Sequence, residues 1–380
     1  MAFHDCVGPA CDGCINIEDP NNAGLDAATN PLEAVYTHFD DHLSRSDFWQ
    51  LAAHVSLIRG GLNVGCNKKH CEFFDLQYQF GRKDCKTSPF HYHIDDAGDA
   101  HGDWDELERV MGQFDLDDEE IVTLMGAHSL GGADTHNSGF KYNWQVDHLN
   151  FDNGYYQNMV KLHYEVENVA GRKSSPKMEF VADSGRVANE APEAGDGAEA
   201  GAEVPEADAE VPEVDAEDPE VPEVEAAEAE NEEVLMLNVD MALLRNLHSE
   251  QNKKHRFTGA VKCPSKKYDR NIFLDEGVEG QVEQCEYART AHLVKEYAKN
   301  LDKFYDAFPS VWAKVNSHGC ENLSAPVDKR DHKCGWCIPS QAFCVAGFEK
   351  AGKCCPGYEC VDNKCQKEEH KEYDDHYYRH

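Results

Sequence analysis

A long acidic segment, residues 187–233, decides which parts of this chain can form a folded core. It contains nineteen Asp and Glu residues and no Lys or Arg, in imperfect Glu-Val-Pro-Glu repeats without an aromatic residue. Such a composition cannot bury enough apolar surface to offset the entropy lost on folding, so we expect a disordered, extended loop. The main globular domain must therefore be assembled from residues 1–186 and 234–320, on either side of this segment.

The acidic segment also carries −19 of the net charge of −36, which leaves −17 for the rest of the chain. A field of this sign attracts calcium, basic matrix proteins or cationic substrates, and it repels nucleic acid. The alternative is a solubilising spacer without a specific partner.

The cysteine content points to an oxidising compartment. Sixteen cysteines, an even number, are typical of a chain stabilised by disulfide bonds. The first residues show neither the basic region nor the apolar stretch of a signal peptide. No run of eighteen apolar residues occurs, so no segment is expected to span a membrane.

One histidine lies at the end of an amphipathic run. Residues 115–125 begin with acidic residues, which favour the positive end of a helix, and then place apolar residues on one face. This pattern predicts a helix whose buried face continues to His128. A histidine there is either a hydrogen-bonded core residue or an axial ligand of a haem iron, and the pattern alone leaves both open.

Five segments then follow one another in a characteristic order. They are Phe3-His4-Asp5-Cys6 with Cys11, Asp19-Pro20-Asn21-Asn22, Gly81-Arg82-Lys83-Asp84, Leu124–Gly131 with Trp144 beyond it, and Met236–Leu244. Together they resemble the plant, fungal and mitochondrial haem peroxidase superfamily, and the proximal segments are most similar to its cytochrome c and ascorbate branches. The resemblance covers residues 1–183 and 234–320. It implies a mainly α-helical, two-lobed haem peroxidase fold and a disulfide between Cys6 and Cys11.

The resemblance implies a role for each motif residue. His128 would bind the iron of haem b, and Asp240 would hold the other ring nitrogen and raise its basicity. His4 would move the proton of hydrogen peroxide, with Asn22 fixing its tautomer and Phe3 lining the haem.

Trp144 would pack on the proximal imidazole, where it either stores an oxidising equivalent or only fills space. The implied reaction is oxidation of a donor by hydrogen peroxide through a ferryl intermediate, with the haem supplying the oxidation chemistry. The donor cannot be read from these motifs, since relatives share them while oxidising different substrates.

An arginine expected from the resemblance has no counterpart. The family places it four residues before the acid-base histidine, and this chain starts three residues before His4. Losing one preorganised donor costs roughly 2.7–4 kcal/mol in the transition state. We therefore expect an N-terminally truncated, impaired peroxidase with too few residues for the distal helix. The same missing segment would have carried the signal peptide of a secreted protein.

A proximal cation site is expected just beyond His128. Ser129, Asp147, Asp152 and the carbonyl of Asn150 fall where relatives hold potassium or calcium, and Gln145 replaces a usual threonine. Two carboxylates favour calcium. Alternatively, the two acids only cap the next helix.

Two further acidic positions resemble metal ligands of the family. Asp5 and Asp12 would belong to a distal calcium site, although Cys14 stands where a serine would coordinate and is expected to pair with a downstream cysteine such as Cys85. Asp134 lies where manganese-oxidising relatives place a ligand. The alternative for Asp134 is a solvated carboxylate near a haem propionate.

A second insert, residues 249–287, interrupts the resemblance, and we expect a disulfide between Cys263 and Cys285 to close it. The family pattern resumes with a helix from His292 to Asn300. It continues through Phe304, Phe308 and Trp312.

The C-terminal residues change character. Residues 334–365 resemble the inhibitor cystine knot module, which would be supported mainly by its disulfides. The usual pairing would join Cys337 with Cys355, Cys344 with Cys360 and Cys354 with Cys365. Cys320 and Cys334 would tether this module, and residues 366–380 are expected to be disordered.

The sequence thus predicts a secreted, mainly helical haem peroxidase with an acidic loop and a small disulfide-rich module. Two other classes stay open. One is a haem-binding but catalytically weak extracellular matrix protein. The other is a partner-binding protein led by the cystine-knot-like module.

Overall fold

A computed structural model describes residues 1–7, 10–19, 22–64, 78–85, 98–169, 177–184, 232–254, 256–263, 285–324, 337–338, 353–354, 358–361 and 364–367. Nearly all of the acidic segment, Cys334, Cys344, Cys355 and residues 368–380 lie outside these residues, whereas Gln366 and Lys367, which were expected to be disordered, pair with strand residues. The chain divides into two compact units, residues 1–77 with 82–321 and residues 78–81 with 322–380.

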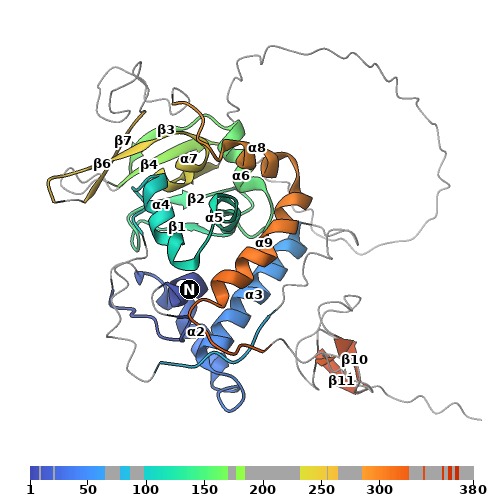
Figure 1. The fold of residues 1–380 in the computed structure, drawn as a ribbon. Helices are drawn as coiled ribbons and strands as arrows, with labels where there is room; N and C mark the ends of the chain where they lie inside the picture. Colours follow the sequence, from blue (N-terminus) through green and yellow to red (C-terminus); the bar gives the residue numbers. More distant parts are fainter. Residues whose placement is uncertain are drawn as a thin grey trace, which may run out of the picture. The chain divides into compact units, whose positions relative to one another are not determined.

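Helices supply most of the regular structure of the first unit (Figure 1). They are α1 (Ala2–Cys6), α2 (Asp26–Tyr36), α3 (Arg45–Asn63), α4 (Trp104–Met111), α5 (Asp118–Met125), α6 (Gly154–Lys161), α7 (Asn238–Leu244), α8 (Ala291–Lys299) and α9 (Leu301–Asn316), with the short 3₁₀ helices η4 (Gly112–Phe114) and η5 (Gly126–Ser129). The mainly helical class agrees with the sequence prediction. The two-lobed arrangement stays a prediction.

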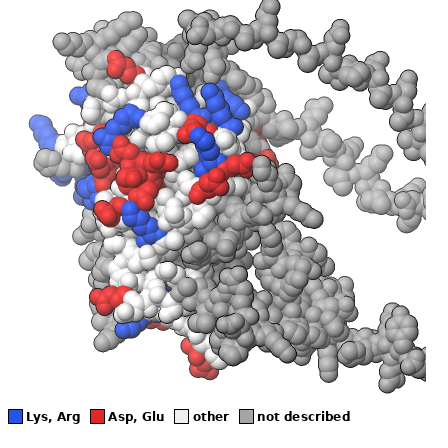
Figure 2. All heavy atoms as spheres, turned by 45° about the vertical axis from the view of Figure 1, so that its right-hand side comes forward, with Lys and Arg blue, Asp and Glu red and all other residues white. Residues whose placement is uncertain are grey.

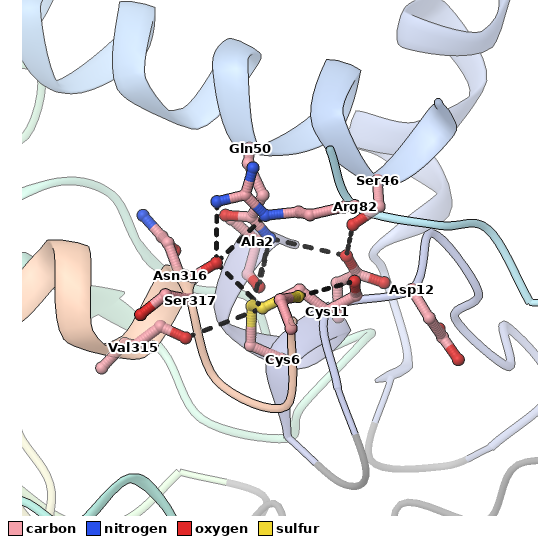
Figure 3. The surroundings of a disulfide bond; sticks show 12 residues. Ala2, Cys6, Cys11, Asp12, Ser46, Gln50, Arg82, Val315, Asn316 and Ser317 are labelled. Carbon is pink, nitrogen blue, oxygen red and sulfur yellow. Dashed lines mark hydrogen bonds between the residues drawn. A yellow bond between two sulfur atoms is a disulfide. The ribbon is translucent and has the colours of Figure 1, made fainter. Parts of the chain in front are cut away.

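Helix α1 contradicts the expectation that too few residues precede the motif for a helix to form. The N–H of Val7 donates to the carbonyl of Phe3 at 3.0 Å, which closes a turn. The Gln50 side chain of α3 donates to the carbonyl of Ala2 at 3.2 Å, and Cys6 is fully buried (Figure 3). Tertiary contacts therefore stabilise a turn that would not persist by itself.

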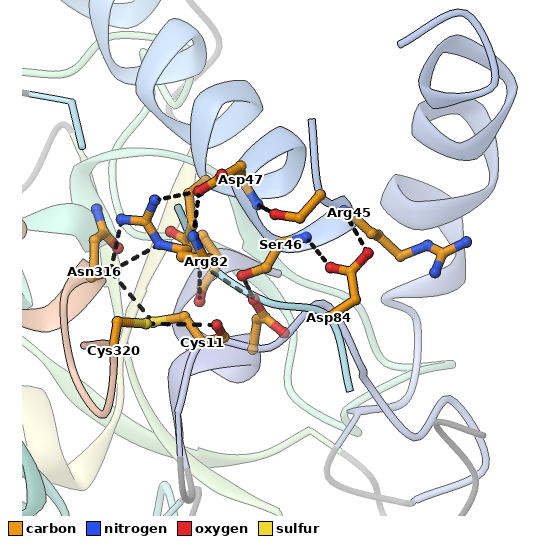
Figure 4. Close-up of polar contacts among 12 residues, drawn as sticks. Cys11, Arg45, Ser46, Asp47, Arg82, Asp84, Asn316 and Cys320 are labelled. Atoms are coloured by element: carbon orange, nitrogen blue, oxygen red, sulfur yellow. Dashed lines mark hydrogen bonds and ion pairs between the residues drawn. The ribbon is translucent and has the colours of Figure 1, made fainter. Parts of the chain in front are cut away.

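The segment containing Arg82 connects two long helices. Its guanidinium pairs with Asp47 of α3 at 2.8 Å and donates to the carbonyl of Asn316 of α9 at 2.7 and 3.0 Å (Figure 4). The carboxylate of Asp84 accepts the N–H groups of the first residues of α3, at 2.9 and 3.0 Å. Ser44 accepts a third N–H, so side chains satisfy the start of α3.

Three expected disulfides are formed in the described residues: Cys6–Cys11, Cys14–Cys85 and Cys263–Cys285. Cys320, expected to help tether the C-terminal module, is a free thiol that donates to the carbonyl of Cys11. The pairing proposed for the cystine knot lies outside the described side chains.

A five-stranded sheet packs with the helices, in the order β1-β2-β5-β4-β3. Its strands are β1 (Gly132–Ala133), β2 (Tyr142–Asn143), β3 (Glu165–Asn168), β4 (Met178–Asp183) and β5 (Glu233–Met236). Antiparallel β4 and β5 end at the pair Asp183 and Glu233, so the acidic segment connects two neighbouring strands. Glu233 was expected to be the last residue of the disordered segment. It is instead the first residue of β5, because its main chain pairs with Asp183 of β4.

The region after α7 follows the predicted outline. A hairpin of β6 (His248–Gln251) and β7 (Phe257–Lys262) precedes the Cys263–Cys285 disulfide. Helices α8 and α9 then resume the family pattern. The side chains of Phe304, Phe308 and Trp312 are all buried in the main core.

The second unit contains short strands. Strand β8 (Cys337–Ile338) pairs in parallel with β9 (Lys353–Cys354), and β10 (Tyr358–Val361) is antiparallel to β11 (Lys364–Lys367). Phe80 and Ser324 form an isolated antiparallel bridge.

Acidic and basic side chains lie next to one another on the face drawn in Figure 2. Arg289 pairs with Asp118 at 2.8 Å and Glu108 at 3.2 Å, and Lys314 pairs with Glu120 at 2.7 Å. Exposed ion pairs stabilise a folded protein by about 0–1 kcal/mol each, so most of the stability must come from the apolar core. In the part of the chain that the structure describes, no helix is long and apolar enough to cross a membrane.

Candidate active site

His128 is positioned by the helix that precedes it. A reciprocal cap starts α5, with Asp117 accepting the N–H of Glu120 at 2.9 Å and Glu120 accepting that of Asp117 at 3.0 Å. The α-helix begins three residues later than the sequence pattern suggested and ends at Met125. His128 follows in the 3₁₀ turn η5, half-buried beside the buried face of α5.

The structure brings His128 and Asp240 together although they are far apart in the sequence. The His128 Nδ1 lies 2.8 Å from Asp240 Oδ1, and the side chains are 30% and 0% exposed. Because a carboxylate only accepts, Nδ1 carries a proton, and in the neutral ring the lone pair is therefore on Nε2.

Asp240 accepts four hydrogen bonds. Oδ1 also accepts from the Tyr155 hydroxyl at 2.7 Å, while Oδ2 accepts from Trp144 Nε1 at 2.9 Å and from the Leu237 N–H at 2.8 Å. Burial raises the pKa of Asp240, but the contacts with His128, Leu237 and Tyr155 outweigh it and hold this pKa below 3.8. Asp240 is therefore a buried carboxylate that stays ionised.

Two aromatic rings enclose the His128 imidazole. The Trp144 indole stacks on it with centroids 4.0 Å apart and planes at 21°, and Tyr155 meets it edge-on at 5.9 Å. The stacking of Trp144 was expected, whereas Tyr155 was not singled out in the sequence. A Tyr-Tyr pair on the amphipathic helix α6 is typical of core packing, so no local signal marked it.

A second histidine cluster lies on α1. Asn22 is fully buried and donates through Nδ2 to the carbonyl of Asn16 at 2.8 Å, which leaves its Oδ1 to accept from His4 Nδ1 at 2.9 Å. This orientation places the proton on Nδ1 and leaves the lone pair on Nε2. Asn22 thus has the contact that would fix the tautomer.

Burial lowers the pKa of His4 from 6.5 to about 4, and the bond to Asn22 opposes this shift without reversing it. His4 is therefore neutral at physiological pH. Phe3 beside it packs against Phe114, with ring centroids 5.8 Å apart. Within the described residues no hydrogen bond or ring contact joins this cluster to the His128 cluster.

The expected proximal cation residues are arranged around an amide. Gln145 is buried, and its Nε2 donates to the carbonyls of Asp147 and Asn150, each at 3.1 Å. Asp152 accepts the N–H of Gly154, the first residue of α6, at 2.8 Å, so the capping alternative holds for Asp152, while no contact among the described residues gives Asp147 this role. The carbonyl of Asn150, the backbone oxygen expected to bind the cation, thus already accepts from Gln145, and an ion would have to displace this amide.

Two buried oxygens of the same group, Ser129 Oγ and Gln145 Oε1, have no partner among the described residues. Buried oxygens without a partner are atoms that an ion could use, whereas the Asn150 carbonyl is already bonded to the Gln145 amide.

The expected distal calcium residues are also hydrogen-bonded within the protein. Asp5 Oδ1 accepts from the Cys14 N–H at 3.1 Å, and Oδ2 accepts from Ser46 at 3.2 Å and Gln50 at 3.5 Å. Burial, reinforced by Asp12, raises the pKa of Asp5 to about 7. In this arrangement the oxygens of Asp5 are used by donors of the protein itself, so the distal calcium site stays a prediction.

Asp134 is exposed. Its Oδ1 accepts the N–H of His136 at 2.8 Å and of Asn137 at 3.3 Å, which ties the turn after β1. This contact gives Asp134 a structural role without a metal.

Comparison with known proteins extends these observations. Residues 1–252 match the family model described as "Peroxidase". "L-ascorbate peroxidase 1, cytosolic" of Oryza sativa subsp. indica is 33% identical over 141 residues, which is 37% of this chain and 50% of that protein. "L-ascorbate peroxidase 2, cytosolic" of Arabidopsis thaliana is 33% identical over 143 residues, or 37% and 50%. "Putative heme-binding peroxidase" of Debaryomyces hansenii is 27% identical over 154 residues, or 40% and 33%.

The chain spans about half the length of the ascorbate peroxidases it matches. These relatives are named as cytosolic, others are named as peroxisomal, and nothing points to secretion. The prediction of a secreted protein is therefore wrong. It relied on the number of cysteines, which limits how many disulfides can form but does not identify a compartment.

Proposed function

This chain belongs to the peroxidase family, and from that premise we propose that it is a haem-dependent peroxidase that oxidises a donor with hydrogen peroxide. The observation that carries the proposal is the His128 and Asp240 pair, in which a buried carboxylate holds one ring nitrogen and leaves Nε2 for a metal. Imidazole with such a partner is a strong iron ligand. Haem b is accordingly the proposed cofactor, and it supplies the oxidation chemistry when bound.

His4 is the proposed acid-base group. Because its pKa is about 4, Nε2 is free to accept a proton from peroxide at neutral pH and to return it afterwards. Asn22 keeps that lone pair on Nε2 by accepting from Nδ1, and Phe3 is proposed to line the pocket. The amide of Asn22 is itself held by Asn16, so this geometry is fixed before a substrate arrives.

Trp144 is proposed to keep the imidazole in place. Its ring covers one face of His128, and its N–H is tied to the same carboxylate. Both contacts restrict rotation of the His128 ring. The same indole lies closer to the His128 ring than the phenol of Tyr155 does, so it is the proposed site for storing an oxidising equivalent.

We also propose that the protein works without a resident calcium or potassium ion, since Gln145 occupies the proximal carbonyls and Asp5 is held by neutral donors. The donor substrate is proposed to be a small reductant, with ascorbate as the first to test because relatives are named for it.

The test is peroxide-dependent oxidation of ascorbate and of a phenol by the full chain loaded with haem. His4→Ala should lower turnover by about 10²–10⁴-fold. The exposed His136→Ala is the matched control and should leave turnover unchanged. Turnover that is equal in both variants would contradict the role of His4, and a haem spectrum without turnover would favour a haem-binding protein instead.

A further inference from the structure

We propose that Tyr155 is a positioning residue for the proximal histidine: its hydroxyl donates to Asp240 Oδ1 and thereby limits how strongly that oxygen draws the Nδ1 proton of His128. The inference rests on the proposed haem function and assigns to it a residue outside the motifs in the sequence.

The contact is short and buried. The Tyr155 hydroxyl lies 2.7 Å from Asp240 Oδ1, and both side chains are fully buried. A bond of this length between a hydroxyl and a carboxylate is charge-assisted. The edge-on packing of Tyr155 against His128 at 5.9 Å holds the phenol in place beside the imidazole.

Among the described residues, Tyr155 is the one donor that shares an oxygen of Asp240 with His128. A carboxylate has about two lone-pair sites on each oxygen. On Asp240, Trp144 and the Leu237 N–H use those of Oδ2, while His128 and Tyr155 use those of Oδ1. The two donors on Oδ1 therefore compete for the same negative charge.

Water cannot take over this role because the carboxylate is sealed from solvent. Replacing Tyr155 by Phe would remove one donor without opening a path to Asp240, which is 0% exposed. More charge on Oδ1 would then act on the Nδ1 proton of His128. The imidazole would gain anionic character and bind ferric iron better than ferrous iron.

The main test is the ferric to ferrous midpoint potential of the haem-loaded full chain. Tyr155→Phe should shift the equilibrium toward ferric haem by about tenfold, which is 59 mV for one electron. The matched control is Tyr156→Phe: this neighbour is equally buried on the same helix, but its hydroxyl donates to the carbonyl of Val122 at 2.8 Å. The midpoint potential of Tyr156→Phe should equal that of the unmodified protein.

A second variant covers the case in which Tyr155→Phe does not fold. Difluorotyrosine at position 155 keeps the hydroxyl and makes it a stronger donor, so the potential should move in the opposite direction, toward ferrous haem. Equal potentials in the unmodified protein, in Tyr155→Phe and in the fluorinated protein would overturn the proposal. A shift of the same size in Tyr156→Phe would also overturn it.

The haem-free chain separates this inference from the proposed function. At one fixed pH, the NMR shift of the His128 Nδ1 proton should move to higher frequency in Tyr155→Phe and stay in place in Tyr156→Phe. A chain that binds no haem but shows this change would refute the proposed function and retain the Tyr155 contact. A chain that binds haem but shows no change in this NMR shift would retain the proposed function and refute the role of Tyr155.

Discussion

Replacing Gln145 by Thr should turn an ion-insensitive protein into one that responds to cations. In the unmodified chain, the Gln145 amide holds the carbonyls of Asp147 and Asn150 at 3.1 Å each. Threonine is too short to reach both carbonyls, so these two hydrogen bonds are lost. At about 1 kcal/mol each, the free energy of unfolding should fall by about 2 kcal/mol in chelator.

Calcium or potassium should then recover this loss in the variant alone. The site would offer the two carbonyls, Asp152 and the buried hydroxyl of Ser129, which has no partner among the residues the structure describes. An ion at one hundred times its dissociation constant stabilises the folded state by about 2.7 kcal/mol, which exceeds the expected loss. The unmodified protein should gain nothing, because its amide already fills the position.

Urea unfolding of the haem-free chain, in chelator and in saturating calcium or potassium, measures both effects. Gln157→Thr is the matched control, since Gln157 is a neighbouring half-buried glutamine whose amide donates to Asn153 and not to these carbonyls. A calcium-induced gain in the unmodified protein as large as that in Gln145→Thr would refute the idea that the amide closes the site.

Three further outcomes are expected. The second-order rate with peroxide should fall only as pH drops through about 4, because the pKa of His4 is about 4, and a stopped-flow midpoint near 6.5 would contradict its burial. Burial raises the pKa of Glu179 from 4.5 to about 7, so the folded protein binds this proton more tightly than the unfolded chain does. The free energy of unfolding should therefore fall as the pH rises from 4.5 to 7, by at most about 3 kcal/mol. Glu179→Gln should remove that fall between pH 5 and 8 in urea unfolding, and an unchanged slope would show that another group causes it. Trp144→Phe keeps a ring on His128 but loses the hydrogen bond to Asp240, so it should lower the free energy of unfolding by about 1.5–3 kcal/mol. An unchanged midpoint of urea unfolding would show that this hydrogen bond does not stabilise the folded protein.

Much of the candidate site could be predicted because its signals are local. The acidic first turn and apolar face of α5 position His128, and the spacing to Trp144 and the Met236–Leu244 segment identified the residues that now surround it. The Cys263–Cys285 pair followed from its closure of an insert. These features depend either on residues close in the sequence or on distances along the chain that are typical of the family.

Other features depend on contacts between distant segments. The turn of α1 is supported by Gln50 from α3, and counting residues before the motif could not include that support. Tyr155 reaches Asp240 across 85 positions, so nothing in its own helix marks it. Gln145 replaced an expected ligand, but only the side-chain rotamer reveals that its nitrogen, and not its oxygen, meets the carbonyls.

The central claim is that His128 binds the haem iron through Nε2 while Asp240 holds Nδ1. The most direct measurement is a haem titration of the purified chain, followed by absorption spectroscopy and haem content, with His128→Ala compared with the control His136→Ala. We expect the unmodified chain and the control to bind one haem with the spectrum of a histidine ligand, and His128→Ala to lose that spectrum. Unchanged haem content and an unchanged spectrum in His128→Ala would contradict the assignment.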